Sequence, residues 1–552
     1  MGKKGADEVR AADGLTRRSF LGGAAAGAAL TGAAGSLACA AAEGPADGGP
    51  FDRETDVVVV GAGTGLAGAL AAAVAGAEVL VLEKRVVPGG TTSISGGVAW
   101  VPNNAVMRAE GIRDSREQAL TYVRTLSQGQ ADEELIEAFV DRGPEMATFL
   151  EENSPLRWRV SKVMGAVADY HPEWEGSVLR GRSIEPDVDA ERLFFGGDLI
   201  NYLLQGVDAA GAEIVTDAVV QRLIVHRNSD GDAEVLGVEA VLAGEPVRIR
   251  ARRGVLLAAG GFGWNSEMRQ HFLRGPSLYA LGVNSATGDG IRMAQAVGAD
   301  LRNMNECWGI TCYKGPAEEQ LAAGGGPSIM AQVEKAFPGS ISVNRYGERF
   351  ANEAGDYDST WRSYLAWENW GELRYRNIPA FQISDAKVRR ERSMAGRTAQ
   401  ESLPDWIVQA PTLRELAEKL GIDPDGLERT VVEFNRHARG GLDPAFHRGE
   451  SAYDRRGDPS PSVTLAPVEE PPFYGTEVSP AHLDTSGGAR VNRHAQVLNP
   501  FGQPIARLYA SGNNAGVGSP GASYGGGGGT IGPALTFAYI AGRHAAGLDD
   551  GA

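Results

Sequence analysis

The feature that most constrains the fold is a stretch at residues 56–83, whose pattern predicts a strand, a glycine turn, a helix and a second strand. The valines at 57–60 suit a strand that is buried on both faces. Glycines at alternate positions between Gly61 and Gly65 let backbone N–H groups approach a pyrophosphate. A helix predicted from Leu66 to about Ala75 would point its positive end at that phosphate. The stretch predicts a nucleotide-binding βαβ unit, and the alternative is a glycine-rich turn without a ligand.

Glu83 closes the second strand of this unit. It follows the turn by about twenty residues, the spacing at which a carboxylate accepts hydrogen bonds from an adenosine ribose. The order of strand, turn, helix, strand and acid is more specific than the glycines alone.

Composition limits the classes of partner. With 552 residues and 43% hydrophobic content, the chain is long enough for a large core and for more than one domain. A net charge of −17 argues against nucleic acid or an anionic membrane surface as a partner.

Residues 1–40 predict a targeting signal. Arg17 and Arg18 precede a weakly hydrophobic run rich in alanine and glycine, and Ala38-Cys39-Ala40 follows as a cleavage pattern. This arrangement resembles a twin-arginine export signal. The run is shorter than the ~20 residues that a spanning helix needs, so no stable membrane span is expected. We expect export to the periplasm, the cell surface or the medium; an alanine-rich tail or lipidation of Cys39 are the alternatives.

Beyond that signal the chain contains Cys307 and Cys312. No second pair lies nearby, so no metal or iron–sulfur site is expected. A disulfide is left open, and no haem attachment motif is present. Electrons would therefore pass to or from an external partner or a diffusible molecule that the sequence does not identify.

Small and hydroxylated residues crowd the segment from Pro88 to Asn104, where they would let backbone approach a bulky flat ligand. With Ser95-Gly-Gly97 and Trp100-Val-Pro-Asn-Asn104, this segment resembles the fumarate reductase and 3-ketosteroid dehydrogenase family of flavoproteins, and most closely its ketosteroid branch. The resemblance covers nearly all of residues 54–546.

The resemblance implies FAD as cofactor and an α/β fold, α+β overall. The expected architecture is a Rossmann-like FAD-binding domain of the glutathione-reductase type with an inserted substrate (capping) domain. We expect the FAD-binding domain at 51–274 and 475–552, and the substrate domain at 275–474.

The residues expected to bind FAD lie in glycine turns and hydroxyl-rich loops. They are Gly61, Gly63, Thr64, Gly65, Glu83, Lys84, Gly90, Thr91, Thr92, Ser95, Gly96, Gly97, Gly260, Gly261, Gly512, Asn513, Gly529, Thr530 and Ile531. The glycine run at 525–529 is followed by Pro533, which suits the first turn of a helix better than a linker. The start of that helix would face the flavin edge that becomes negative on reduction.

The resemblance also implies the catalytic residues. Tyr357 stands where the family's ketosteroid dehydrogenases have a tyrosine and its fumarate reductases an arginine. Tyr524 and Gly528 match the ketosteroid motif Tyr-Pro-Gly-x-Gly-x-Thr, although Gly525 replaces the proline. The histidine and the Asn-Arg pair that bind dicarboxylates in fumarate reductases are missing, which weighs against a small diacid as substrate.

The resulting hypothesis is a dehydrogenation next to a ring ketone. The Tyr524 hydroxyl and the Gly528 N–H would polarise the ketone oxygen. Tyr357, as phenolate, would take the α-proton, helped by a second tyrosine for which Tyr170 is the candidate. The β-hydrogen would pass as hydride to flavin N5.

The expected substrate is an apolar, steroid-like ketone, and the tryptophans at 361, 367 and 370 suggest an apolar pocket near Tyr357. Two alternatives stay open. One is an ene-reductase that runs the same chemistry backwards, and the other is a flavoprotein used for electron transfer or binding.

Overall fold

The structure, a computed structural model, describes residues 49–162, 168–188, 194–229, 231–275, 279–325, 330–517 and 523–548. The predicted export signal at 1–40 lies outside these residues. Residues Gly49–Ala552 form one unit by their internal contacts. The division into an FAD-binding and a substrate domain stays a prediction.

An eight-stranded sheet forms around the strand β1 (Arg53–Val60), as the valine run predicts. β1 lies parallel to β2 (Val79–Leu82) and to β9 (Glu245–Leu257). β6 (Glu213–Val215) and β19 (Pro504–Ala510) extend this parallel part on either side. The antiparallel strands are β7 (Ala218–Arg227), β8 (Ala233–Leu242) and β18 (Gln496–Leu498).

The helix α2 (Gly65–Val74) follows the glycine turn and packs against the last helix, α15 (Ile531–Ala545). A Cβ on Gly68 would lie 2.6 Å from the Ala538 oxygen, and one on Gly542 would lie 2.1 Å from the Gly68 oxygen. These glycines therefore allow the two helices to approach closely. The predicted helix is confirmed with its start one residue earlier, at Gly65 rather than Leu66.

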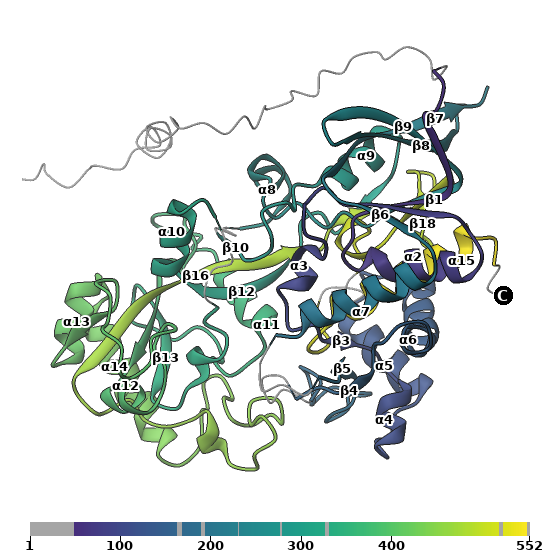
Figure 1. The fold of residues 1–552 in the computed structure, drawn as a ribbon. Coiled ribbons are helices and arrows are strands. Elements are labelled where there is room, and N and C mark those ends of the chain that lie inside the picture. Colours follow the sequence, from purple (N-terminus) through teal and green to yellow (C-terminus); the bar gives the residue numbers. More distant parts are fainter. Residues whose placement is uncertain are drawn as a thin grey trace, which may run out of the picture. The chain divides into compact units, whose positions relative to one another are not determined.

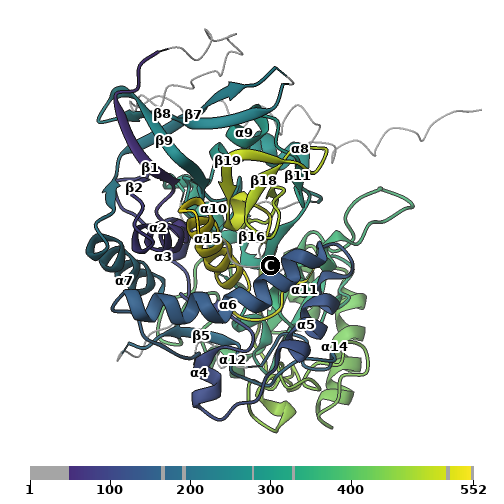
Figure 2. The ribbon, with the colours of Figure 1, turned by 90° about the vertical axis from the view of Figure 1, so that its right-hand side faces the viewer.

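The same core contains α6 (Glu133–Asn153) and α7 (Gly196–Ala209). α6 packs against α15 (Figure 2). The rings of Phe149 on α6 and Tyr539 on α15 lie 5.0 Å apart.

A second, six-stranded sheet is organised around the long strand β16 (Phe473–Thr485) (Figure 1). Its other strands are β10 (Tyr279–Ala280), β12 (Cys307–Tyr313), β13 (Ser340–Asn344), β14 (Ala380–Ser384) and β15 (Val408–Ala410). The helices α13 (Leu413–Leu420) and α14 (Pro424–Ala438) bury their apolar sides with residues of this sheet.

Shorter strands and helices complete the described fold. The strands are β3 (Ala99–Trp100), β4 (Trp158–Val160), β5 (Ser183–Pro186), β11 (Leu301–Arg302) and β17 (Gly488–Ala489). The helices are α3 (Gly90–Ser93), α4 (Ala105–Ala109), α5 (Arg116–Ser127), α8 (Ser266–Phe272), α9 (Asp289–Ala296), α10 (Lys314–Ala322), α11 (Tyr357–Arg362) and α12 (Ala386–Glu391). Within the described part of the chain, no helix is long and apolar enough to cross a membrane.

Candidate active site

Most of the predicted site residues line one cavity of about 620 Å³. The predicted FAD-binding residues that line it are Gly61, Gly63, Thr64, Glu83, Lys84, Gly90, Thr91, Thr92, Ser95, Gly96, Gly97, Gly260, Gly512, Asn513, Thr530 and Ile531. The four catalytic candidates, Tyr170, Tyr357, Tyr524 and Gly528, line the same cavity. The structure thus brings together segments that are more than four hundred residues apart in sequence.

Three predicted residues do not line the cavity, and each has a packing or turn role instead. A Cβ on Gly65 would lie 2.7 Å from that of Ala258, and a Cβ on Gly261 would lie 2.3 Å from Thr485 Oγ1. Gly529 donates its N–H to the Gly526 oxygen at 3.0 Å and so closes a turn.

The turn after β1 requires glycine at its first position. Gly61 has a φ of +106°, and a Cβ there would lie 2.4 Å from the Ala258 oxygen. This backbone is strained for any residue with a side chain. The turn can therefore keep its shape, and its approach to a bound phosphate, only with glycine.

Two helices begin at this cavity without a side-chain cap. Thr64 at the start of α2 and Thr530 at the start of α15 both line the cavity, and neither caps its helix through its side chain. Uncapped N-terminal N–H groups attract anions. Ser511, which also lines the cavity, has a buried hydroxyl without a partner among the described residues.

Glu83 is held by backbone donors on the cavity wall. Its carboxylate accepts hydrogen bonds from the N–H groups of Ala62 and Arg85, both at 2.9 Å. Next to it, Lys84 Nζ donates to Thr287 Oγ1 at 2.9 Å and Asp289 Oδ2 at 2.6 Å. The glycine turn, the helix starts without side-chain caps and this carboxylate fit the pyrophosphate and ribose of FAD.

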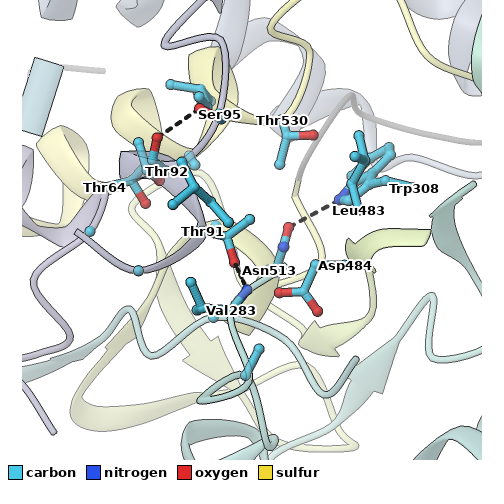
Figure 3. A pocket seen from close by; sticks show the side chains of 18 of the residues that line it. Thr64, Thr91, Thr92, Ser95, Val283, Trp308, Leu483, Asp484, Asn513 and Thr530 are labelled. Carbon is cyan, nitrogen blue, oxygen red and sulfur yellow. Dashed lines mark hydrogen bonds between the residues drawn. The ribbon is translucent and has the colours of Figure 1, made fainter. Parts of the chain in front are cut away.

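The middle of the cavity contains a hydrogen-bonded group that joins the two sheets (Figure 3). Trp308 Nε1 on β12 donates to Asn513 Oδ1 at 3.1 Å. Asp484 on β16 accepts the N–H of Gly263 at 3.1 Å and is hydrogen-bonded to Asn513. Burial nevertheless raises the pKa of Asp484 above its ordinary range.

Tyr170, Tyr357 and Tyr524 form a cluster at one end of the cavity. The Tyr357 ring lies 5.5 Å from that of Tyr170 and 5.0 Å from that of Tyr524. The hydroxyl of Tyr357 is hydrogen-bonded to the hydroxyls of both neighbours. Tyr357 is the first residue of α11, and Asp356 caps this helix by accepting the Ser359 N–H at 2.9 Å.

Burial raises the pKa of Tyr357 well above its ordinary value, and the neighbouring Tyr170 and Tyr524 raise it further. The sequence hypothesis requires a neighbour that lowers the pKa of Tyr357 and so favours its phenolate form. In the structure, Tyr170 and Tyr524 raise this pKa instead. A neutral Tyr357 is therefore the ground state, and its proton must leave before it can act as a base.

Tyr524 is held from within its own loop. Its hydroxyl oxygen accepts the Thr530 N–H at 3.1 Å and lies 2.8 Å from Thr530 Oγ1. The proline that Gly525 replaces is not needed for this placement, because the Gly525 oxygen accepts the N–H of Tyr170 at 3.1 Å and the hydroxyl of Tyr122 at 3.0 Å. The loop is thus tied to Tyr170 directly.

Gly528 has a φ of +93°, and its oxygen accepts the N–H of Trp100 at 3.0 Å. Its own N–H has no protein partner within the described residues. Together with the Tyr524 hydroxyl, this N–H can supply the second donor of a two-donor site for a ketone oxygen.

Sequence reasoning missed other residues of this cavity, including Tyr453, Gln332 and Trp308. The Tyr453 ring lies 4.8 Å from that of Tyr170, and its hydroxyl is hydrogen-bonded to Gln332. Neither residue belongs to a motif, so no local signal points to them.

The expectation that the tryptophans after Tyr357 form the pocket is wrong. Trp361 is buried against Gly309, and Trp367 and Trp370 are 54% and 89% exposed. The tryptophan among the described lining residues is Trp308. Cys307 and Cys312 are both buried, and they form no disulfide with each other.

The chain is similar in sequence to a known protein family and to several of its members. Residues 56–530 match the family model described as FAD binding domain. The chain is 36% identical to a 3-oxosteroid 1-dehydrogenase of Mycobacterium tuberculosis, over 90% of this chain and 98% of the relative. It is 35% identical to a 4-oxocyclohexanecarboxylate 2-dehydrogenase of Sinomonas cyclohexanicum, over 90% of this chain and 94% of the relative.

A similar solved structure is the 3-ketosteroid delta1-dehydrogenase of Sterolibacterium denitrificans in complex with 1,4-androstadiene-3,17-dione. The TM-score is 0.82 at 27% identity, and the match covers 90% of this chain and 100% of that one. The predicted α/β fold and the predicted FAD cofactor are thereby confirmed.

Proposed function

This chain belongs to the FAD-binding domain family and is an FAD-dependent oxidoreductase, and we propose that it is a dehydrogenase of the 3-oxosteroid 1-dehydrogenase type. Such an enzyme introduces a C=C bond next to a ring ketone. The observation that carries the proposal is the meeting of Tyr170, Tyr357 and Tyr524 beside Gly528 at one end of the FAD cavity.

The residues have distinct roles in this proposal. The Tyr524 hydroxyl and the Gly528 N–H donate to the ketone oxygen and stabilise the enolate that develops there. The Tyr357 oxygen takes the α-proton, and Tyr170 exchanges hydrogen-bonded protons with Tyr357. Bound FAD supplies the acceptor for the β-hydrogen. The buried cluster excludes water from the α-carbon.

The cavity wall near the tyrosines favours an apolar, neutral ketone. Leu281, Trp308, Ile310 and Met330 line it there. Lys84 is the one lysine or arginine among the described lining residues, and it pairs with Asp289 beside the Glu83 end. A steroid-like ketone therefore suits this wall better than a ring ketone with a carboxylate, which needs a cationic partner.

The direction of the reaction is the second question. An ene-reductase would use Tyr357 as the proton donor, and its raised pKa suits a neutral donor. We favour dehydrogenation because both of the relatives compared above are named as dehydrogenases. The physiological electron acceptor is not assigned.

Anaerobic mixing of the FAD-loaded protein with candidate substrates tests the proposal. A saturated 3-ketosteroid is expected to bleach the flavin absorbance and to give the 1,2-unsaturated ketone. Bleaching by 4-oxocyclohexanecarboxylate alone would assign the smaller substrate instead. Loss of an enone with reduced viologen as donor, without any bleaching by saturated ketones, would assign the ene-reductase.

We also propose that residues 1–40 direct export by the twin-arginine route, on the support of Arg17, Arg18 and the Ala38–Ala40 cleavage pattern. Fusion of this segment to a folded reporter is expected to move the reporter out of the cytoplasm. The double change Arg17→Lys and Arg18→Lys should keep it inside, and export of that variant would contradict the proposal.

A further inference from the structure

A buried lysine lies behind the loop that carries Tyr357. Lys335 is 1% exposed. Its Nζ donates to the Glu353 oxygen at 2.6 Å, the Gly355 oxygen at 3.2 Å and Thr360 Oγ1 at 3.2 Å. An ammonium group has three N–H donors, so each one has a partner on the segment 353–360.

Other contacts also hold this segment. The Glu353 carboxylate accepts from Arg349 at 2.6 Å and from Arg448 at 3.1 Å. Asp356 caps α11, and Gln332 Nε2 donates to the Gly355 oxygen at 3.3 Å. The carbonyl groups that Lys335 binds lie in the protein interior, where an unpaired carbonyl is costly. Lys335 binds two of these carbonyl groups together with the Thr360 hydroxyl, and it thus helps to tie the middle of the segment, two residues before Tyr357.

Charges around Lys335 act in both directions. Asp356 and Glu353 favour the ammonium form, while Arg456 and Arg448 oppose it. Burial has the largest effect and lowers the pKa of Lys335 to about 7. A neutral amine has two N–H donors, so loss of the proton removes one of the three hydrogen bonds.

We propose that Lys335 is a positioning residue for Tyr357, which in its ammonium form holds the segment 353–360 so that the Tyr357 hydroxyl faces the α-carbon of the substrate. The inference rests on the proposed function, because it takes Tyr357 as the group that exchanges the α-proton. Lys335 itself does not touch the substrate.

The change Lys335→Met in the FAD-loaded protein tests this role. We expect kcat to fall about tenfold or more with KM within about twofold, because misplacement of the proton acceptor affects the chemical step. Hydrogen exchange should become faster in peptides that span 353–360, and flavin absorbance should be retained.

Lys314→Met is the matched control. Lys314 pairs with Glu477 at 2.8 Å and does not line the FAD cavity. The variant Lys314→Met should have the wild-type kcat and wild-type exchange rates in the segment 353–360. Wild-type kcat and exchange in Lys335→Met would overturn the inference.

The pH dependence separates positioning from a general loss of stability. In the wild type, the plot of log kcat against pH should show an inflection near neutral pH, and this inflection should be absent in Lys335→Met. Its persistence in the variant would overturn the assignment to Lys335.

If Lys335→Met does not fold, hydrogen exchange in the wild-type protein tests the role of Lys335. Exchange in 353–360, corrected for its intrinsic pH dependence, should be faster at about pH 8 than at about pH 6. Equal protection at both values would overturn the inference. Activity of Tyr357→Phe would instead contradict the proposed function, whereas an inactive Tyr357→Phe with a normal Lys335→Met contradicts only the role of Lys335.

Discussion

The two ends of the cavity are built from different parts of the chain. The nucleotide end consists mainly of backbone, the turn at Gly61 and the uncapped starts of α2 and α15, together with the Glu83 carboxylate. The ketone end consists mainly of side chains, the buried hydroxyls of Tyr170, Tyr357, Tyr453 and Tyr524, together with the Gly528 N–H. The first end is therefore sensitive to an added Cβ, and the second to the loss of a single oxygen atom.

The largest expected effect is at the ketone end. Tyr357→Phe should lower kcat by about 10³-fold or more, because it removes the proton acceptor and leaves the ring in place. Flavin absorbance should be unchanged. Tyr364→Phe is the control, since Tyr364 is buried nearby outside the cavity. Near-normal turnover of Tyr357→Phe would show that the ketone end is not sensitive to the loss of this oxygen atom.

The next effect concerns pH. Burial and the neighbouring tyrosines raise the pKa of Tyr357, and dehydrogenation needs its deprotonated form. The fraction of phenolate grows about tenfold for each pH unit below the pKa. Initial rates should therefore rise from neutral to alkaline pH, apart from the inflection assigned to Lys335. In Lys335→Met, where that inflection is not expected, a rate that falls steadily over this range would show that Tyr357 acts as a proton donor.

At the nucleotide end, Gly61→Ala should reduce the FAD content of the purified protein. The new Cβ would meet the Ala258 oxygen at 2.4 Å, and a φ of +106° adds strain of about 1–3 kcal/mol. Gly76→Ala is the matched control, because Gly76 has a φ of +87° with nothing within 4 Å of the added Cβ. The ratio of flavin to protein measures the effect, and equal ratios in the two variants would contradict it.

The smallest effect is expected where the two ends meet. Trp308→Phe removes the donor to Asn513 Oδ1, a hydrogen bond worth about 0.5–1.5 kcal/mol, or up to about tenfold in kcat/KM. Trp406→Phe removes a similar indole hydrogen bond, to Glu319 at 2.8 Å, outside the cavity. Steady-state kinetics with a 3-ketosteroid should give a lower kcat/KM for Trp308→Phe than for Trp406→Phe. Identical kcat/KM values would show that the hydrogen bond from Trp308 to Asn513 is dispensable.

Much of the nucleotide end could be predicted from the sequence, because its parts are short and continuous. The turn at Gly61, the strand before it and Glu83 each depend on nearby residues. For Gly65 and Gly261 the sequence predicts contact with the cofactor, but it does not show the close packing that the structure finds at both positions. This packing depends on Ala258 and Thr485, which lie just after β9 and at the end of β16.

The ketone end was predictable only where a motif resembles a known family, as for Tyr357 and Tyr524. Tyr453, Gln332 and Trp308 have no such motif and come from separate segments. The sequence also suggested tryptophans after Tyr357 as the pocket wall, and two of these face solvent.

The sequence by itself determined the nucleotide site, which follows from local glycine spacing. Through its resemblance to a known family it also indicated FAD, the fold class and the candidates Tyr170, Tyr357, Tyr524 and Gly528 at the ketone end. The tertiary structure alone decided the ionisation of those groups and the contacts that hold them. A pKa depends on burial and on neighbours from distant segments, as at Tyr357 and Lys335. These neighbours meet only when the two sheets pack around one cavity.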